Sequence, residues 1–351
     1  MNRRQFLMTA GGTAAALAVS VATAEEERTN STMDFSQIRG FNYQPSWGSS
    51  GFEIWRNFDQ DRMGHELSLG RAYFPKMNTI RLWLSHDAWL RNPAKFEGDF
   101  DAALALAAAR GMSVVPVLFN RWHDASLDYG GVYLDHFLPK ASWVQGKDQL
   151  MAFAEALFSA HAKDARILAW DLCNEPFSYG CSPAEIPDIV KAEFAWLERT
   201  YAAGKRLGVQ APITTGIHPG HGIEGIRQIE PISDILSIHP YWTCDSPPHD
   251  KAAYEKSLDD YVAFAASVNK PLIATETCWG STDDAKRVEI IRYTLGQLKQ
   301  RGIGFLVYLL HHSLIADAHR IEFGPLSAPG NLAFIEADGA LRPGHEAYNE
   351  F

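Results

Sequence analysis

The feature that most constrains the fold is a regular alternation of short apolar runs with longer helical patterns. The apolar runs favour strands, and the longer segments carry Ala, Leu, Glu and Lys at helical spacing. The eight strand candidates are residues 38–43, 79–85, 113–120, 167–173, 212–217, 235–241, 271–277 and 302–310. The clearest helix candidates are residues 99–110, 147–163, 184–207, 254–268 and 283–301.

Strands that are apolar along their whole length are typical of a parallel sheet covered by helices. Eight βα units in 351 residues predict an α/β fold in which this sheet closes into a single-domain (β/α)8 barrel, the TIM barrel. Several helix candidates end on a residue that stops a helix, at Gly111, Gly208, Asn269 and Gly302. The rival is a doubly wound open sheet, which typically carries a glycine-rich phosphate turn after an early strand. None of the early runs is followed by such a turn.

The charge of the chain limits its partners. It carries 32 Lys and Arg against 42 Asp and Glu, for a formal net charge of −10. Such a surface repels nucleic acid and anionic membranes and suits a neutral substrate. Hydrophobic content of 46% and charged content of 21% are ordinary for a globular protein, which excludes wholesale disorder.

Residues 1–24 have the pattern of an export signal. Arg3 and Arg4 form a twin-arginine start, an apolar stretch follows, and Ala22-Thr23-Ala24 offers a cleavage site. The alternative is an N-terminal membrane anchor, for which the apolar stretch is shorter than the roughly 20 residues required. We therefore expect a signal peptide at 1–24, a linker at 25–36 and the barrel at 37–351, in a periplasmic or extracellular protein that is not inserted in a membrane after signal cleavage. No motif requires a cofactor.

The chain has 4 cysteines, too few for a disulfide scaffold at this length. Cys181 and Cys244 follow predicted strands, and an exported protein allows them to pair, a question that the sequence leaves open. Cys173 and Cys278 each lie two residues from a glutamate of interest and are predicted to be buried, reduced thiols.

Two glutamates stand where apolar runs end at a turn. Glu175, within Asn174-Glu175-Pro176, closes the fourth run, and Glu276 closes the seventh. In a (β/α)8 barrel the carboxyl ends of the strands meet at one face, where active sites are built. A buried carboxylate is costly unless it is paired or hydrogen-bonded, so two of them indicate a site that uses them. One proton donor and one nucleophile are what cleavage of a glycosidic bond requires.

Other strand ends add polar and aromatic side chains. Arg81 lies inside an apolar run, so it needs an anionic partner unless it reaches the bottom of the barrel. Along the seventh run, Ala274 and Glu276 share a face, and we expect the small Ala274 to leave room for Glu276 above the core. The polar candidates are Asn42, Arg81, His239, Tyr241 and His311, and each histidine, including His218, His221 and His312, has a structural role as its alternative. The candidates to stack on sugar rings, of which some belong to the core instead, are Trp47, Trp55, Trp83, Trp122, Trp242 and Trp279.

Four of these signals occur in the right strands and in the right order for a known clan. They are Asn-Glu-Pro after strand four, Glu276-Thr277-Cys278-Trp279-Gly280 after strand seven, Arg81 in strand two and His239-Pro240-Tyr241 in strand six. Together they resemble the retaining glycoside hydrolases of clan A, most nearly family 5, the cellulase and β-mannanase family. The resemblance covers roughly residues 40–312.

The resemblance implies a division of roles between the two carboxylates. Glu175 would be the general acid/base and Glu276 the nucleophile, with Arg81 and Tyr241 bonded to the nucleophile. Physical reasoning agrees, because a cation and a hydroxyl donor keep a nucleophile ionised. A proton donor, in contrast, is expected to have a pKa raised by burial or by a like charge.

The resemblance also implies that Asn174 holds the 2-hydroxyl of the sugar and that His239 lies near the acid/base. Two departures from the family blur the substrate. Residues 308–312 lack the tryptophan that usually ends strand eight, and strand three ends in Asn120 where a histidine is more usual, unless His123 takes that place.

We therefore predict an exported enzyme that cleaves β-glycosidic bonds, in β-glucan or β-mannan, by double displacement with a carboxylate separation of roughly 5–5.5 Å. The glycan, the linkage, endo or exo action and the oligomeric state stay open. One alternative is a metal-dependent barrel hydrolase that uses the histidines and Asp171, but the H-x-H expected near its first strand is missing from the sequence. The other alternative is a catalytically silent sugar-binding barrel.

Overall fold

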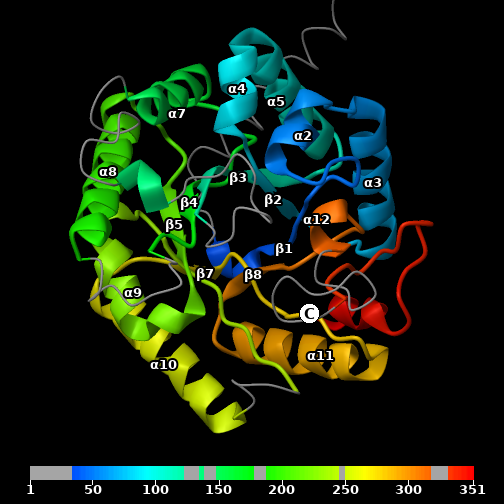
Figure 1. The fold of residues 1–351 in the computed structure, drawn as a ribbon. Helices are drawn as coiled ribbons and strands as arrows, with labels where there is room; N and C mark the ends of the chain where they lie inside the picture. The colour runs from blue at the N-terminus through cyan, green and yellow to red at the C-terminus, as the bar shows by residue number, and fades with distance from the viewer. Residues whose placement is uncertain (1–33, 122–133, 138–147, 178–186, 245–249, 318–330) are drawn as a thin grey trace, which may run out of the picture. The chain divides into compact units, whose positions relative to one another are not determined.

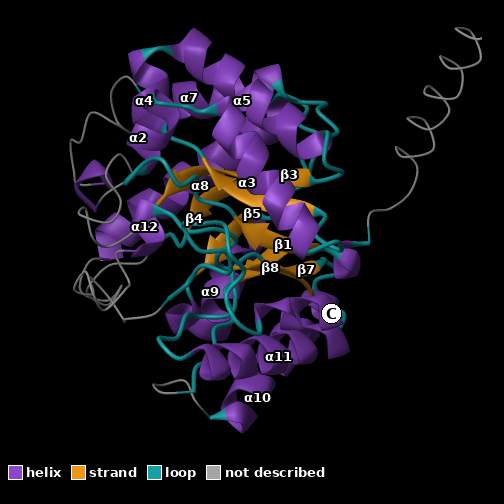
Figure 2. Ribbon diagram, turned by 90° about the vertical axis from the view of Figure 1, so that its right-hand side faces the viewer, coloured by secondary structure: helices purple, strands orange, loops and turns teal. Residues whose placement is uncertain are grey.

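Eight parallel strands close into a barrel, in which each strand pairs with the next along the chain and β8 pairs with β1. The computed structural model describes residues 34–121, 134–137, 148–177, 187–244, 250–317 and 331–351. Figure 1 looks along the barrel and shows the helices arranged around the strands, and Figure 2 shows the strands enclosed between helices. The strands are β1 Arg39–Asn42, β2 Thr79–Trp83, β3 Ser113–Asn120, β4 Trp170–Asn174, β5 Ile213–Ile217, β6 Leu236–Ile238, β7 Leu272–Ala274 and β8 Gly304–Val307.

Most of the helices begin at a side-chain cap. Asp59, Ser85, Asn92, Asp148, Asp250 and Asp283 each accept a hydrogen bond from a backbone N–H in the first turn. The α-helices are α2 Gly51–Arg56, α3 Gln60–Tyr73, α4 His86–Arg91, α5 Pro93–Ala108, α7 Gln149–Ala160, α8 Pro187–Arg206, α9 Gly222–Ile229, α10 Lys251–Ser267, α11 Asp284–Gln300 and α12 Leu314–Asp317. None of those within the described ranges is both long and apolar enough to cross a membrane.

The predicted (β/α)8 barrel is confirmed. Each of the eight apolar runs overlaps one strand, and each of the five helix candidates overlaps a helix. The predicted helix stops are also confirmed, because Gly111, Gly208, Asn269 and Gly302 all have positive φ, between 53° and 74°.

Most of the buried apolar side chains fill two regions. Inside the barrel, a small cluster of inward-facing residues includes Val115, Ile235, Ile273 and Leu306. A larger cluster lies between the strands and the helices and includes Ala274. The expectation that Ala274 leaves room inside the barrel below Glu276 was therefore wrong. Strand β7 ends at Ala274, so strict alternation does not continue as far as Glu276.

One G-x-G-x-x-G spacing does occur, late in the chain, from Gly220 before α9 to Gly225 in its first turn. Close packing accounts for its last glycine, because a Cβ at Gly225 would lie 2.7 Å from the side chain of Ile217. Gly222 has a φ of 53°, which favours glycine. The closed barrel shows that this spacing does not mark a doubly wound sheet.

Candidate active site

Arg81 lies at the centre of the polar site at the carboxyl end of the barrel. Its guanidinium is 0% exposed and donates to Glu276 Oε1 at 2.5 Å and to Asp171 Oδ2 at 2.8 Å. It also donates to Asn42 Oδ1 at 3.0 Å and to Asn174 Oδ1 at 2.7 Å. The sequence predicted an anionic partner for this buried cation, and the structure gives it two carboxylates. The planar guanidinium has five N–H donors, so it can bind both at once.

An irregularity in β4 allows this arrangement. Side chains three residues apart on a regular strand point to opposite faces, yet both Asp171 and Asn174 reach Arg81. The pairing of β4 with β5 shifts register between these two residues. The shift adds one extra residue to β4, which turns Asn174 to the same side as Asp171.

Glu276 is held through both of its carboxylate oxygens. Oε1 accepts from Arg81, and Oε2 accepts from the Tyr241 hydroxyl at 2.7 Å. Burial and the neighbouring charge of Glu276 raise the pKa of Tyr241 well above its usual value of 10, so this hydroxyl keeps its proton. A cation and a neutral hydroxyl donor are the partners expected around a carboxylate that acts as a nucleophile.

Glu175 is paired with a histidine. Its Oε1 lies 2.7 Å from Nδ1 of His239, and its backbone N–H donates to the Gly216 carbonyl at 2.9 Å. Glu175 is 3% exposed and has a φ of 48°, a left-handed conformation that is uncommon outside glycine. The turn after β4 therefore presents this carboxylate toward β6 and β7.

One expectation about Glu175 was wrong. Burial raises the pKa of Glu175, as predicted for a proton donor, but the hydrogen bond and the charge of His239 outweigh burial. The pKa consequently lies below its ordinary value of 4.5. Glu175 and His239 therefore form one hydrogen-bonded pair.

The two carboxylates lie close together. Glu175, His239 and Glu276 each offer an atom within 4.8 Å of the other two, a grouping that could also hold a metal ion. An oxygen–oxygen approach of that size fits the roughly 5–5.5 Å separation of retaining glycosidases better than the roughly 6.5–9.5 Å of inverting ones. Both oxygens of Glu276 already bind protein donors, Arg81 and Tyr241, with which a metal ion would compete.

Three aromatic side chains adjoin the carboxylates. The guanidinium carbon of Arg81 lies 4.6 Å from the centre of the Trp83 ring, which meets Tyr308 edge-on at 6.1 Å. Trp279 meets Tyr241 edge-on at 5.5 Å. Trp83, Trp279 and Tyr308 are all partly exposed, so each has surface available to a ligand. Tyr308 occupies the end of β8, where family 5 usually has tryptophan.

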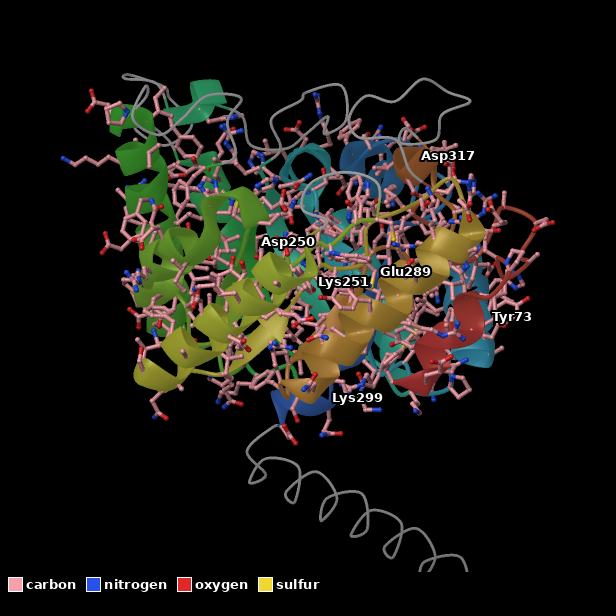
Figure 3. The ribbon with its side chains drawn as sticks, turned by 90° about the horizontal axis from the view of Figure 1, so that it is seen from below. Tyr73, Asp250, Lys251, Glu289, Lys299 and Asp317 are labelled. Carbon is pink, nitrogen blue, oxygen red and sulfur yellow. The ribbon has the colours of Figure 1, made fainter. Side chains whose placement is uncertain are left out.

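Two of the six candidate stacking residues, Trp242 and Trp55, belong to the core instead. Trp242 is 2% exposed, and its ring packs on Tyr293 at 4.6 Å, with Lys251 Nζ 5.0 Å from its centre. Figure 3 shows α10 and α11 side by side, with the labelled Lys251 and Glu289 in the region where Lys251 Nζ reaches Glu289 Oε1 at 3.3 Å. Trp55 is also 2% exposed and donates to the Trp83 carbonyl, so it belongs to the core.

The remaining candidates have other surroundings. Asn42 is 0% exposed and donates to the Thr275 carbonyl at 2.9 Å, so it supports Arg81 from below and does not face a substrate. His311 is 6% exposed, and its Nδ1 lies 2.9 Å from the His312 carbonyl oxygen, which is a structural contact.

Trp47 is partly buried and donates to a backbone carbonyl at 3.0 Å. Trp122 and Cys181, and with it the possible disulfide to Cys244, lie outside the described residues.

Asn174 uses both ends of its amide within the protein. Its Oδ1 accepts from Arg81, and its Nδ2 donates to Asn120 Oδ1 at 2.9 Å. The amide nitrogen carries a second hydrogen, which is the group that a sugar hydroxyl would meet. Asn120 therefore orients Asn174 from the end of β3, where the family more often has histidine.

Sequence reasoning missed three buried residues of the site, Gly216, Ser237 and Thr275, and named a fourth, Asp171, only for the metal-dependent alternative. Asp171 holds Arg81, and Gly216 lies so close to His239 that a Cβ there would be 2.6 Å from Nε2. Thr275 and Ser237 stand behind the same histidine, with Thr275 Oγ1 3.0 Å from Nε2. Polar residues inside the apolar runs were the available signal for Asp171, Ser237 and Thr275.

The two thiols near the glutamates are buried, as expected. Cys173 and Cys278 are both 0% exposed. Burial raises the pKa of the Cys278 thiol to about 12, so it is not a thiolate at neutral pH. Thiolate chemistry at this residue is therefore disfavoured.

The fold and the site together define the class: a (β/α)8 barrel with paired glutamates after strands four and seven, the arrangement that the resemblance to clan A implies. No family model matches the chain. Two curated proteins described as mannan endo-1,4-β-mannosidase F are similar to part of it. The one from Aspergillus fumigatus is 25% identical over 177 residues, 48% of this chain and 36% of its own. The one from Aspergillus clavatus is 28% identical over 122 residues, 33% of this chain and 26% of its own.

Solved structures extend this likeness to nearly the whole barrel. An exo-β-1,4-mannosidase from Opitutaceae bacterium strain TAV5 matches with a TM-score of 0.66 at 19% identity, covering 89% of this chain and 58% of that one. A glycoside hydrolase family 5 mannosidase from Rhizomucor miehei matches at 0.63 and 13% identity, covering 89% and 92%. An endo-1,4-β-D-mannanase from Thermotoga petrophila matches at 0.60 and 15% identity, covering 89% and 98%. The predicted resemblance to family 5 is thereby confirmed at the level of the fold, while the curated relatives are matched over little more than a third of their length or less.

Proposed function

We propose that this protein is a retaining glycoside hydrolase that cleaves β-1,4-linked mannosides. The observation that carries the proposal is the pair formed by Glu175 and Glu276, which lie within 4.8 Å of each other in different surroundings. Glu276 is bound by a cation and a hydroxyl donor, whereas Glu175 lies 2.7 Å from a ring nitrogen of His239. Two carboxyl groups with such different partners suit a nucleophile and an acid/base.

In the first step, a carboxylate oxygen of Glu276 attacks the anomeric carbon as the bond to the leaving oxygen breaks. Glu175 delivers a proton to that oxygen, so the departing sugar leaves as a neutral alcohol. The glycosyl group is then an ester of Glu276, and the negative charge that faced Arg81 has been lost.

In the second step, Glu175 removes a proton from water, and the resulting oxygen attacks the anomeric carbon and releases Glu276 as a carboxylate. Arg81 and Tyr241 stabilise the charge that returns to Glu276. Two inversions at one carbon give a product with the configuration of the substrate. Protein side chains perform every step of this mechanism.

The substrate class is supported by the relatives. The two curated proteins are described as acting on mannan, and the three structures are described as mannosidases or a mannanase. Partly exposed Trp83 and Trp279 flank the carboxylates and offer faces for sugar rings. A formal net charge of −10 suits a neutral glycan.

We also propose that residues 1–24 direct export by the twin-arginine route and that residues 25–36 link them to the barrel. The supports are the Arg3-Arg4 pair and the Ala22-Thr23-Ala24 cleavage pattern. A polymeric substrate such as mannan is met outside the cytoplasm, which agrees with export.

The test is a product-resolved screen of the purified protein on β-1,4-mannan, β-1,4-glucan, β-1,3-glucan and xylan. We expect mannan to be cleaved fastest, with the β-anomer formed first in NMR spectra recorded during the reaction. First formation of the α-anomer would contradict retention. Activity should survive dialysis against EDTA, and its loss with recovery on adding a divalent metal would favour the metal-dependent alternative.

A further inference from the structure

A chain of buried hydroxyl groups lies behind the Glu175–His239 pair. His239 presents Nδ1 to Glu175 at 2.7 Å and Nε2 to the Thr275 hydroxyl at 3.0 Å. The Ser237 hydroxyl in turn lies within a short hydrogen bond of the Thr275 hydroxyl. All three residues behind Glu175 are at most 1% exposed, so bulk water does not replace these contacts.

The backbone fixes the histidine in this position. Gly216 of β5 lies against the imidazole, where any Cβ would be 2.6 Å from Nε2. Thr275 is held next to His239 because its N–H donates to the Ile238 carbonyl at 3.1 Å. The ring therefore sits between β5 and the segment after β7, with Nε2 facing Thr275 and Nδ1 facing Glu175.

The two hydroxyls can serve His239 in either protonation state. When the pair holds its transferable proton, Nε2 carries hydrogen and donates to Thr275, whose hydroxyl then donates to Ser237. When Glu175 has given the proton away, Nδ1–H donates to the carboxylate, and Nε2 accepts from Thr275, which accepts from Ser237. Reversing both hydroxyls keeps every nitrogen of the buried ring bonded through the catalytic cycle.

We propose that Thr275, with Ser237 behind it, is a positioning residue that keeps the Glu175–His239 pair protonated at working pH. Without the hydroxyl, the protonated state leaves a buried N–H without an acceptor, whereas the deprotonated state leaves only a lone pair without a donor. A buried N–H without an acceptor costs more free energy than a lone pair without a donor, most of all when the imidazole is charged. The pair therefore releases its proton at lower pH when the hydroxyl is missing. This inference rests on the proposed glycosidase function.

The test is the pH dependence of kcat/KM for Thr275→Val, which has nearly the same shape but lacks the hydroxyl. We expect the basic limb to move down by about one pH unit, an effect of the size expected for one charged hydrogen bond, with the plateau at lower pH within about twofold of the parent. Thr275→Ser should restore the parent limb. The matched control is Thr277→Val, because the buried Thr277 hydroxyl donates to the Pro240 carbonyl at 2.7 Å.

Other titratable groups near the pair stay the same in all of these variants, so they do not cause a difference between them. They are Arg81, His218, His221, Tyr241, Glu276 and Tyr308. Two outcomes would show a purely structural role and overturn the proposal. In one, the plateau of kcat/KM falls while the basic limb of the pH profile stays in place; in the other, Thr275→Ser does not restore the basic limb. Should Thr275→Val not fold, Ser237→Ala should shift the limb in the same direction by a smaller amount, and an unmoved limb there would also overturn it.

A second readout separates this inference from the proposed function. In protein labelled with ¹⁵N-histidine, the resonances of His239 can be assigned by their loss in His239→Gln and followed through a pH titration. We expect a lower titration midpoint in Thr275→Val than in the parent, whether or not any glycan is cleaved. Equal midpoints would refute the role of Thr275, while a parent that cleaves no glycan would refute only the proposed function.

Discussion

Arg81 donates to Glu276 at 2.5 Å from a side chain that is fully buried inside the barrel. The same guanidinium holds Asp171 at 2.8 Å, so one cation neutralises two buried carboxylates. We predict that Arg81→Met lowers the free energy of unfolding by about 3–5 kcal/mol, because both acids lose their counter-charge. Chemical denaturation measures this effect. The control is Arg292→Met, which removes an exposed pair with Glu350 and should leave the free energy of unfolding close to that of the parent.

Glu276→Gln tests the nucleophile. The amide keeps the size of the side chain but cannot form the glycosyl ester, so we expect kcat on mannan to fall by at least about 10³-fold with the fold intact. Steady-state kinetics and circular dichroism measure the two quantities. Glu289→Gln, on the outer helix α11, should retain parent activity. Turnover near that of the parent by Glu276→Gln would end the assignment.

Glu175→Ala separates proton donation from nucleophilic attack. On mannan we expect a loss of about 10²–10⁴-fold, because the leaving oxygen is no longer protonated. On an aryl mannoside with an acidic phenol as leaving group, the first step needs no proton, and a burst of phenol should precede slow turnover. Equal losses on both substrates would contradict the role of Glu175 as acid.

Glu193 of α8 predicts a pH-dependent stability. Its side chain is fully buried beside Arg121 and accepts from the Phe177 N–H at 3.3 Å, just after Glu175. Burial raises the pKa of Glu193 from 4.5 to about 7, so ionisation of this group destabilises the fold as pH rises from 4.5 through 7. Glu193→Gln should therefore gain stability relative to the parent between pH 5 and pH 8, by up to about 3 kcal/mol. Paired thermal melts at the two pH values measure this, and a constant difference would contradict it.

The leader is tested by changing Arg3 and Arg4 together to lysine in the full chain. The twin-arginine route reads the arginine pair, so we expect the variant to stay in the cytoplasm of a bacterial host and to keep residues 1–24. Cell fractionation and the N-terminal sequence of the mature protein measure the outcome. Unchanged export would indicate another route.

The barrel and its glutamates were predictable because they depend on periodicity and chain order. Apolar runs at regular intervals indicate eight parallel strands, and the carboxyl ends of such strands meet at one face wherever the individual residues point. Glu175 and Glu276 could therefore be placed together without knowing any side-chain direction. The helix stops at Gly111 and Gly208 depend only on the local backbone.

The remaining details depend on departures from regular geometry. Alternation misplaced Ala274 because β7 ends there, and it gave no reason for Asp171 and Asn174 to meet Arg81 together. Trp242 looked like a stacking residue because it follows Tyr241 at a strand end, yet its ring turns to α10 and α11. The pKa of Glu175 was predicted in the wrong direction because the contact with His239 depends on tertiary distance.

The register shift in β4 matters for anyone who would transplant this catalytic machinery into a designed barrel. Grafting the glutamate and asparagine onto an ideally paired strand would turn one of them out toward the helices, even with every side chain copied. The extra residue that β4 carries between Asp171 and Asn174 is as much a part of the catalytic site as the carboxylates are. A scaffold must therefore be chosen for its ability to accommodate this irregular strand.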